Sequence, residues 1–205
     1  MNPTPDDREP LNAAADIDLE GEALDIWQAD RRARLAQNLL AHRPGEFDRP
    51  GELDPELAGW AEDLAAGRGR NLIITGPVGT GKTWAVWHAA EHAVRAGYEG
   101  GVIITAAGRL RRVVAPATAD PAEFGRYTNA GLLAVDDLGA VRLSEWDMDH
   151  LAELADARWA DHRPTVITSN VSALRDLLGP RISSRLQHNA LILELDGPDR
   201  RRQQP

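Results

Sequence analysis

The 205-residue sequence contains no cysteine. Disulfide bonds, thiolate metal sites and a cysteine nucleophile are therefore excluded, and we expect a cytoplasmic protein. No apolar run approaches the roughly 20 residues that a membrane-spanning helix needs. The polar residues 1–9 do not have the layout of a signal peptide, so we expect no membrane association.

Lysine is almost as scarce. It occurs once, at Lys82, whereas the other 22 basic residues are arginine. Position 82 is therefore expected to need a compact ammonium group rather than a planar guanidinium. The net charge is −9, but residues 1–68 hold sixteen of the 32 acidic and only seven of the 23 basic residues. The charge from residue 69 onward is balanced, so a nucleic-acid surface in that part is not excluded.

The front of the chain differs from the rest in composition. Residues 1–23 are acidic and rich in proline and alanine, and we expect them to be largely disordered. Residues 24–42 have a helical apolar stripe, and residues 43–54 have the Pro and Gly content of a loop. We therefore divide the chain into an acidic, partly disordered segment with one helix, residues 1–54, and one domain, residues 55–205. The predicted helix either binds a groove of a partner or packs onto its own domain.

The remainder alternates between predicted helices and apolar strands. Strands are predicted at 71–75, 101–105, 132–135, 165–168 and 190–195. Helices are predicted at 55–66, 82–96, 109–114, 123–129 and 145–160, followed by two short helices that begin near Ser172 and Pro180. This alternation predicts an α/β fold with a parallel sheet covered by helices on both faces.

The most specific motif lies between the first predicted strand and the helix that follows it. It consists of Gly76, Pro77, Val78, Gly79, Thr80, Gly81, Lys82 and Thr83, and it matches the phosphate-binding pattern G-x-x-x-x-G-K-[ST]. Glycines let backbone N–H groups approach a polyanion, and the helix N-terminus adds its positive dipole end. We expect Lys82 to reach the β- and γ-phosphates of ATP, and the Thr83 hydroxyl to bind Mg²⁺. The alternative is a glycine-rich turn that fits the pattern by chance.

Two acids close the predicted strand 132–135. Carboxylates at this edge of a parallel sheet project into the crevice where ligands bind. We expect Asp136 to hold Mg²⁺ and Asp137 to polarise the attacking water, although a turn also favours aspartate. Many ATPases of this type have glutamate where Asp137 stands, so the shorter side chain predicts slow or partner-stimulated hydrolysis.

Three further polar residues follow. Asn170 ends the next strand and could orient the lytic water, or it could merely turn the chain. Arg181 and Arg185 share a helical face, which is either an ordinary solvated surface or a group that stabilises phosphate charge in a neighbouring subunit.

Taken together, these motifs resemble those of an AAA+ ATPase of the DnaC-like helicase-loader group, close to the IstB-like transposition helpers. The similarity covers about residues 55–202. It implies a P-loop NTPase fold with strand order 5-1-4-3-2 and no large lid domain. It also implies that Arg185 acts on the adjacent subunit and that Arg201, or Arg200, senses the bound nucleotide.

The resemblance implies partners as well. The protein would form a homo-oligomeric spiral or ring on single-stranded DNA and help to place a replicative helicase. Arg109, Arg111 and Arg112 could contact the DNA backbone, although a run of charges is more often a solvated helix face. Without cysteine, the chain cannot have the zinc module of some loaders.

Four functions stay open at this point. The first is an ATP-switched helicase loader, and the second is a transposition helper that delivers target DNA to a transposase. The third is an adaptor that binds nucleotide with little hydrolysis. The fourth is a small-molecule P-loop kinase, which leaves the arginine pair unexplained.

Overall fold

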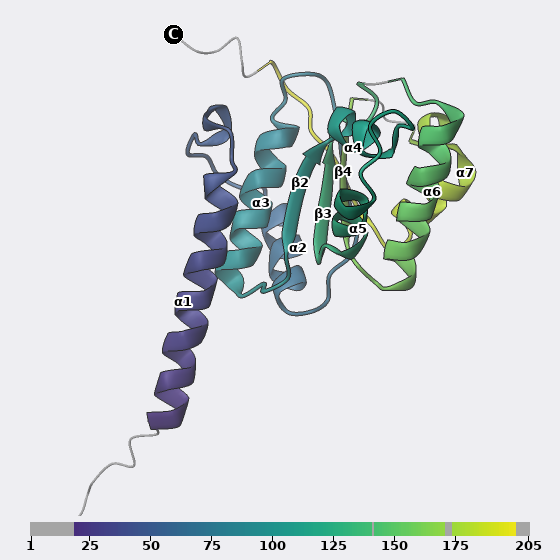
Figure 1. The fold of residues 1–205 in the computed structure, drawn as a ribbon. Helices are drawn as coiled ribbons and strands as arrows, with labels where there is room; N and C mark the ends of the chain where they lie inside the picture. The colour runs from purple at the N-terminus through teal and green to yellow at the C-terminus, as the bar shows by residue number, and fades with distance from the viewer. Residues whose placement is uncertain (1–18, 141, 171–173, 200–205) are drawn as a thin grey trace, which may run out of the picture.

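The computed structural model describes residues 19–140, 142–170 and 174–199. Helices and strands alternate along most of this part of the chain (Figure 1). The helices are α1 (Leu19–Ala41), η1 (Gly45–Phe47, a 3₁₀ turn), α2 (Pro55–Ala65), α3 (Lys82–Ala96), α4 (Ala107–Val114), α5 (Pro121–Asn129), α6 (Glu145–Ala160) and α7 (Leu174–Gln187). The strands are β1 (Leu72–Thr75), β2 (Val102–Ala106), β3 (Leu132–Asp136), β4 (Thr165–Ser169) and β5 (Leu191–Glu194).

Within the described residues, all five strands pair in parallel, in the order β2-β3-β4-β1-β5. This is the implied order 5-1-4-3-2 read from the other edge, so the α/β fold and its topology are confirmed. Successive strand residues point to opposite faces. Leu72 and Ile74 of β1 therefore pack with α1, α2 and α3, whereas Ile73 packs with α4, α5, α6 and α7. The result is a three-layered α/β/α domain.

Local signals explain several helix ends. Asp54 accepts a hydrogen bond from the backbone N–H of Glu56 at 2.8 Å and caps α2. Ser144 and Asp147 form the expected capping box at the start of α6. Within α7, Gly179 has φ 71° and ψ 171°, so the chain kinks there and a second helical stretch begins at Pro180, as predicted. The predicted cap Ser172 lies outside the described residues.

The first helix is longer than predicted. It begins at Leu19, so the expectation that residues 1–23 are largely disordered is wrong for residues 19–23. Four of these five residues are Leu, Glu or Ala, which have high helix propensity. Only the second half of α1 packs on the domain, where Ala36 and Leu39 are buried. The first half projects past the body of the molecule (Figure 1).

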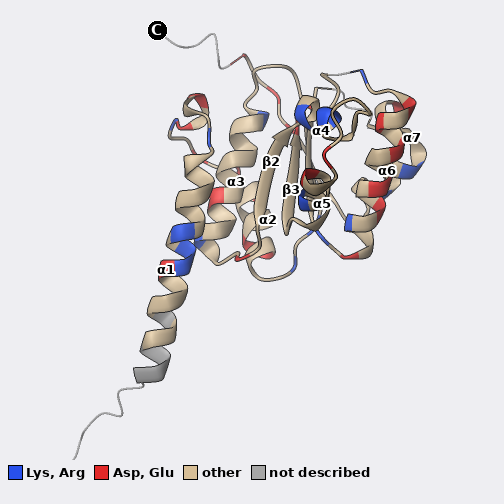
Figure 2. Cartoon of the chain, in the orientation of Figure 1, with Lys and Arg blue, Asp and Glu red and all other residues tan. Residues whose placement is uncertain are grey.

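Charged residues are unevenly spread over the fold. Arginines mark α4 and the middle of α1, whereas α6 is mostly acidic (Figure 2). No described helix is both long and apolar enough to cross a membrane.

Candidate nucleotide site

The phosphate-binding motif forms the turn between β1 and α3, at the carboxyl edge of the sheet. Gly79 and Gly81 have positive φ angles of 86° and 97°, which side chains other than glycine rarely adopt. The Nζ of Lys82 is buried in this turn and donates to the carbonyl oxygens of Gly76 at 2.8 Å and Pro77 at 2.7 Å. The only ammonium group of the side chains thus lies inside a loop that is free of Cβ atoms at Gly79 and Gly81.

The hydroxyl of Thr83 lies against the carboxylate of Asp136. Its Oγ1 donates to the two carboxylate oxygens at 2.9 and 3.1 Å, although the residues are 53 positions apart. A hydroxyl and a carboxylate are the oxygen donors that Mg²⁺ takes beside the phosphates of a bound nucleotide. In the described part of the chain, no group of three or more His or acidic residues could hold a metal alone. The donor set therefore fits a magnesium ion that is bound together with the nucleotide.

Thr168 is a site residue that the sequence reasoning missed. Its Oγ1 donates to Asp136 Oδ1 at 2.6 Å and accepts from the backbone N–H of Asp137 at 2.8 Å. From the neighbouring strand β4, this side chain thereby holds the carboxylate of Asp136 and the backbone of Asp137. A buried hydroxyl at the carboxyl end of an apolar strand was the available signal, because polar groups are rarely buried without a partner.

The two remaining acid and amide candidates differ in position. Asp137 adopts a left-handed backbone conformation, with φ 57°, and lines the same cleft as Lys82. Asn170 is exposed and does not line this cleft in the described structure. Its Oδ1 lies instead beside Gly139, 3.3 Å from where a Cβ would be. A role for Asn170 in orienting water stays a prediction.

The cleft above the motif has a volume of about 760 Å³. One wall consists of the phosphate-binding turn with Asp136, Asp137 and Thr168. The chain that links α1 to α2 also lines the cleft, and we call residues 42–54 the strap. The proline and glycine content of residues 43–54 predicts only a loop and gives it no place in the site.

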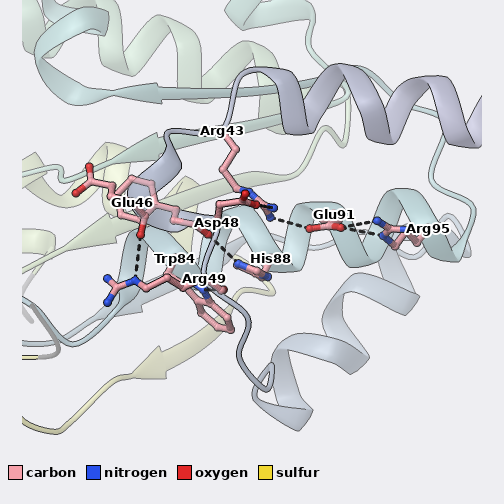
Figure 3. A network of polar contacts seen from close by, with 9 residues as sticks. Arg43, Glu46, Asp48, Arg49, Trp84, His88, Glu91 and Arg95 are labelled. Carbon is pink, nitrogen blue, oxygen red and sulfur yellow. Dashed lines mark hydrogen bonds and ion pairs between the residues drawn. The ribbon is translucent and has the colours of Figure 1, made fainter. Parts of the chain in front are cut away.

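The strap is fastened to α3, the helix that Lys82 begins (Figure 3). Arg43, whose side chain is 9% exposed, pairs with Glu91 at 2.8 Å. The indole of Trp84 stacks on His88 and donates from Nε1 to the carbonyl of Arg49 at 2.9 Å. Gly51 lies so close to this indole that a Cβ would be 2.6 Å from a ring carbon.

A second hollow of about 390 Å³ lies between the strap and the start of α3. Its lining combines apolar residues, among them Leu53, Leu57, Trp84 and Leu195, with the acids Glu52 and Asp54. It adjoins Gly81 and therefore lies next to the phosphate-binding turn.

The three arginines proposed for DNA contact differ in their partners. Arg109 donates to Glu123 from both Nε and Nη2, at 3.0 and 2.8 Å. Arg111 pairs with the buried Asp147 at 3.3 Å. Arg112 is exposed and, like Arg109, lines the cleft. A contact of these residues with DNA stays a prediction.

The predicted pair Arg181 and Arg185 contacts one acidic residue of α6. Both side chains form an ion pair with Asp156, the second at 3.1 Å. They lie outside the cleft of their own chain, as expected for residues that act on a neighbour and equally for an ordinary surface pair. Arg200 and Arg201, the proposed nucleotide sensors, are outside the described residues.

Comparison with known families identifies the chain. Residues 60–205 match the model of the IstB-like ATP-binding proteins. The chain belongs to this family. The family is described as ATP-binding, which agrees with the phosphate-binding motif at residues 76–83.

Two curated relatives support the assignment. A protein of Sinorhizobium fredii, named as an insertion-sequence ATP-binding protein, is 34% identical over 199 residues, which cover 87% of this chain and 78% of the relative. A protein of Pseudomonas fluorescens, named as an insertion-sequence IS1162 ATP-binding protein, is 35% identical over 105 residues, or 49% of this chain and 44% of that relative.

Solved structures confirm the AAA+ fold. The DnaC helicase loader aligns over 69% of this chain and 86% of its own, with TM-score 0.59 and 20% identity. DnaI aligns over 78% and 94%, with TM-score 0.61 and 22% identity. The predicted resemblance to both groups is thus confirmed, and the relatives with higher sequence identity are those of insertion sequences.

Proposed function

We propose that this chain is an ATPase that assists DNA transposition. ATP would bind between the strap and the phosphate-binding turn, copies of the chain would assemble on DNA, and hydrolysis would end the assembly. The observation that carries the ATPase part is the contact of Thr83 with Asp136 beside Lys82. The names of the insertion-sequence relatives support the transposition part.

Each group of the cleft has a role in this proposal. Lys82 would exchange the carbonyls of Gly76 and Pro77 for phosphate oxygens. Thr83 and Asp136 would hold Mg²⁺, which neutralises phosphate charge when it is bound. The hollow beside Trp84 would take the base, with the indole as its aromatic surface.

The hydrolytic step would use the second acid. Asp137 would polarise the attacking water, with Asn170 as a further candidate for orienting it. Arg185 of a neighbouring copy would stabilise the charge on the γ-phosphate, and Arg201 would sense the nucleotide. Because aspartate is one methylene shorter than glutamate, we expect slow turnover that DNA or a partner protein stimulates.

The experiment is nucleotide binding and hydrolysis by the intact chain, with and without DNA. Mg·ATP at millimolar concentration should raise the melting temperature and be hydrolysed, and Lys82→Ala should lose both effects. Retained affinity in Lys82→Ala would remove the assignment of the phosphate-binding turn. Binding without any conversion over hours, with or without DNA, would leave the adaptor function.

A helicase loader is the second candidate, because solved loaders have this fold over most of their length. Capture experiments with the ATP-bound protein separate the two functions. A transposase partner supports the first, and a replicative helicase the second. The mass in solution with ATP and a short oligonucleotide tests the assembly of a spiral or ring.

A further inference from the structure

The outer face of α6 and α7 holds one arginine in a defined orientation. The Nε of Arg185 donates to Asp156 Oδ1 at 3.1 Å, and its guanidinium carbon lies 4.1 Å from the centre of the Trp159 ring. A carboxylate thus fixes one edge of the planar cation while an aromatic face supports it. Arg181 occupies the other carboxylate oxygen, Oδ2.

This arrangement leaves the far end of Arg185 accessible. Its side chain is 38% exposed, and neither Nη nitrogen donates a hydrogen bond to a described residue. Hydrogen bonds from Arg181 and Arg185 hold the pKa of Asp156 below its usual range, so the carboxylate is charged at neutral pH. One acid then faces two arginines, and the cluster has a net positive charge.

An isolated surface ion pair contributes little to stability, and exposed pairs are often of no measurable value. The geometry has a different consequence. A free arginine side chain samples many rotamers, and its ordering opposes any reaction in which it must reach a phosphate. A side chain that is already held at Nε, with neither terminal nitrogen bonded to a described residue, has much of this ordering in place.

We propose that Asp156 and Trp159 are positioning residues that hold Arg185 ready for the nucleotide site of a neighbouring copy. This inference rests on the proposed function. It assigns the two residues to the hydrolysis of ATP bound by another chain, and not to the cleft of their own.

The first test is steady-state ATP hydrolysis by the full-length chain with DNA. Asp156→Asn and Trp159→Leu should lower kcat about 10- to 100-fold, since a small misplacement of a reacting group has effects of this size. Affinity for nucleotide should not change. Trp159→Phe keeps an aromatic face and should retain most activity. The control is Asp161→Asn, which removes the exposed pair of Asp161 with Arg163 on the end of the same helix and should behave as wild type.

The second test asks whose site is affected. A chain with Asp156→Asn keeps an intact cleft, and a chain with Asp137→Asn keeps an intact Arg185. Mixing the two should therefore restore hydrolysis, because one chain supplies what the other lacks. Mixing Asp156→Asn with Arg185→Ala should restore nothing. A misfolded Asp156→Asn chain would not restore hydrolysis with Asp137→Asn, so restoration in that mixture shows that the fold of the Asp156→Asn chain is intact.

The outcomes separate this inference from the proposed function. If wild type does not hydrolyse ATP, both fail. If wild type hydrolyses and Arg185→Ala does not, then wild-type activity of Asp156→Asn and Trp159→Leu overturns the positioning role alone. Full activity of Arg185→Ala would overturn it as well, because Arg185 would then have no part in the reaction.

Discussion

The replacement of Thr83 by valine tests the proposed magnesium site. Valine keeps the shape of threonine and removes the Oγ1 that donates to Asp136 at 2.9 and 3.1 Å. Asp136 still accepts from Thr168 at 2.6 Å, so no buried carboxylate is left without a donor. The lost hydrogen bond should lower the free energy of unfolding by about 1 kcal/mol. For a chain of this length, this corresponds to roughly 2–4 °C in melting temperature.

The effect on nucleotide binding should be larger and specific. A ligand at 100 times its Kd stabilises a protein by about 2.7 kcal/mol, which is roughly 5–10 °C here. In wild type, this shift with ATP should decrease when Mg²⁺ is chelated. In Thr83→Val, the shift should be small with Mg²⁺ and unchanged by chelation, because a ligand of the ion is missing.

Thr80→Val is the matched control. Thr80 lies in the same turn and is buried, but its Oγ1 donates to the carbonyl of Pro77 at 3.0 Å and not to Asp136. This variant should lose a similar amount of stability without nucleotide and keep the Mg²⁺-dependent shift. Thermal unfolding with ATP, with and without Mg²⁺, measures all three proteins. A full Mg²⁺-dependent shift in Thr83→Val would refute the magnesium assignment.

Three further changes have distinct expected outcomes. Trp60→Ala should lower the free energy of unfolding by about 3–5 kcal/mol, because Trp60 is only 1% exposed. Trp27 is 54% exposed, so Trp27→Ala should change this free energy by less than about 0.5 kcal/mol. Urea titrations followed by circular dichroism measure both variants. Burial raises the pKa of Asp147, but hydrogen bonds from Ser144 and the charge of Arg111 outweigh burial and lower it. The charged carboxylate should therefore stabilise the fold relative to Asp147→Asn above about pH 4, and this stabilisation should be lost as the pH falls further. A difference in unfolding free energy between the two proteins that does not change with pH would contradict this. Arg112→Ala should reduce the slope of log affinity for DNA against log salt by about 1, and an unchanged slope would remove this residue from the DNA surface.

Much of the domain could be predicted because its signals are local. A short, largely apolar run such as β1, bounded by a glycine-rich turn, identifies a strand without knowledge of its neighbours. The phosphate-binding turn is equally local, since eight consecutive residues contain it. The order of the strands in the sheet could not be predicted from local signals. It came from the resemblance to a family and not from the pattern of residues, because alternating strands and helices fit several orders of a parallel sheet.

The parts of the site that were missed depend on contacts between distant residues. Thr168 contacts Asp136 across 32 positions, and Arg185 reaches Asp156 across 29. In sequence, Asp156 is one of several acids on α6, and nothing distinguishes it until α7 packs against that helix. Side-chain clusters of this kind require the tertiary arrangement, whereas a motif of consecutive residues does not.

The first helix shows why an apolar stripe does not identify what covers it. From the sequence, this stripe is expected to pack either on a partner or on its own domain. In the structure only part of the stripe is covered, because Leu39 is 8% exposed, whereas Leu24 and Trp27 are 53% and 54% exposed. A partner for the exposed half stays a prediction. Beyond Leu39, the chain continues directly into the strap, which is anchored to α3 by Arg43 and Glu91. Because Lys82 begins α3, the projecting helix is connected through the strap and α3 to the site where we place the phosphates of ATP.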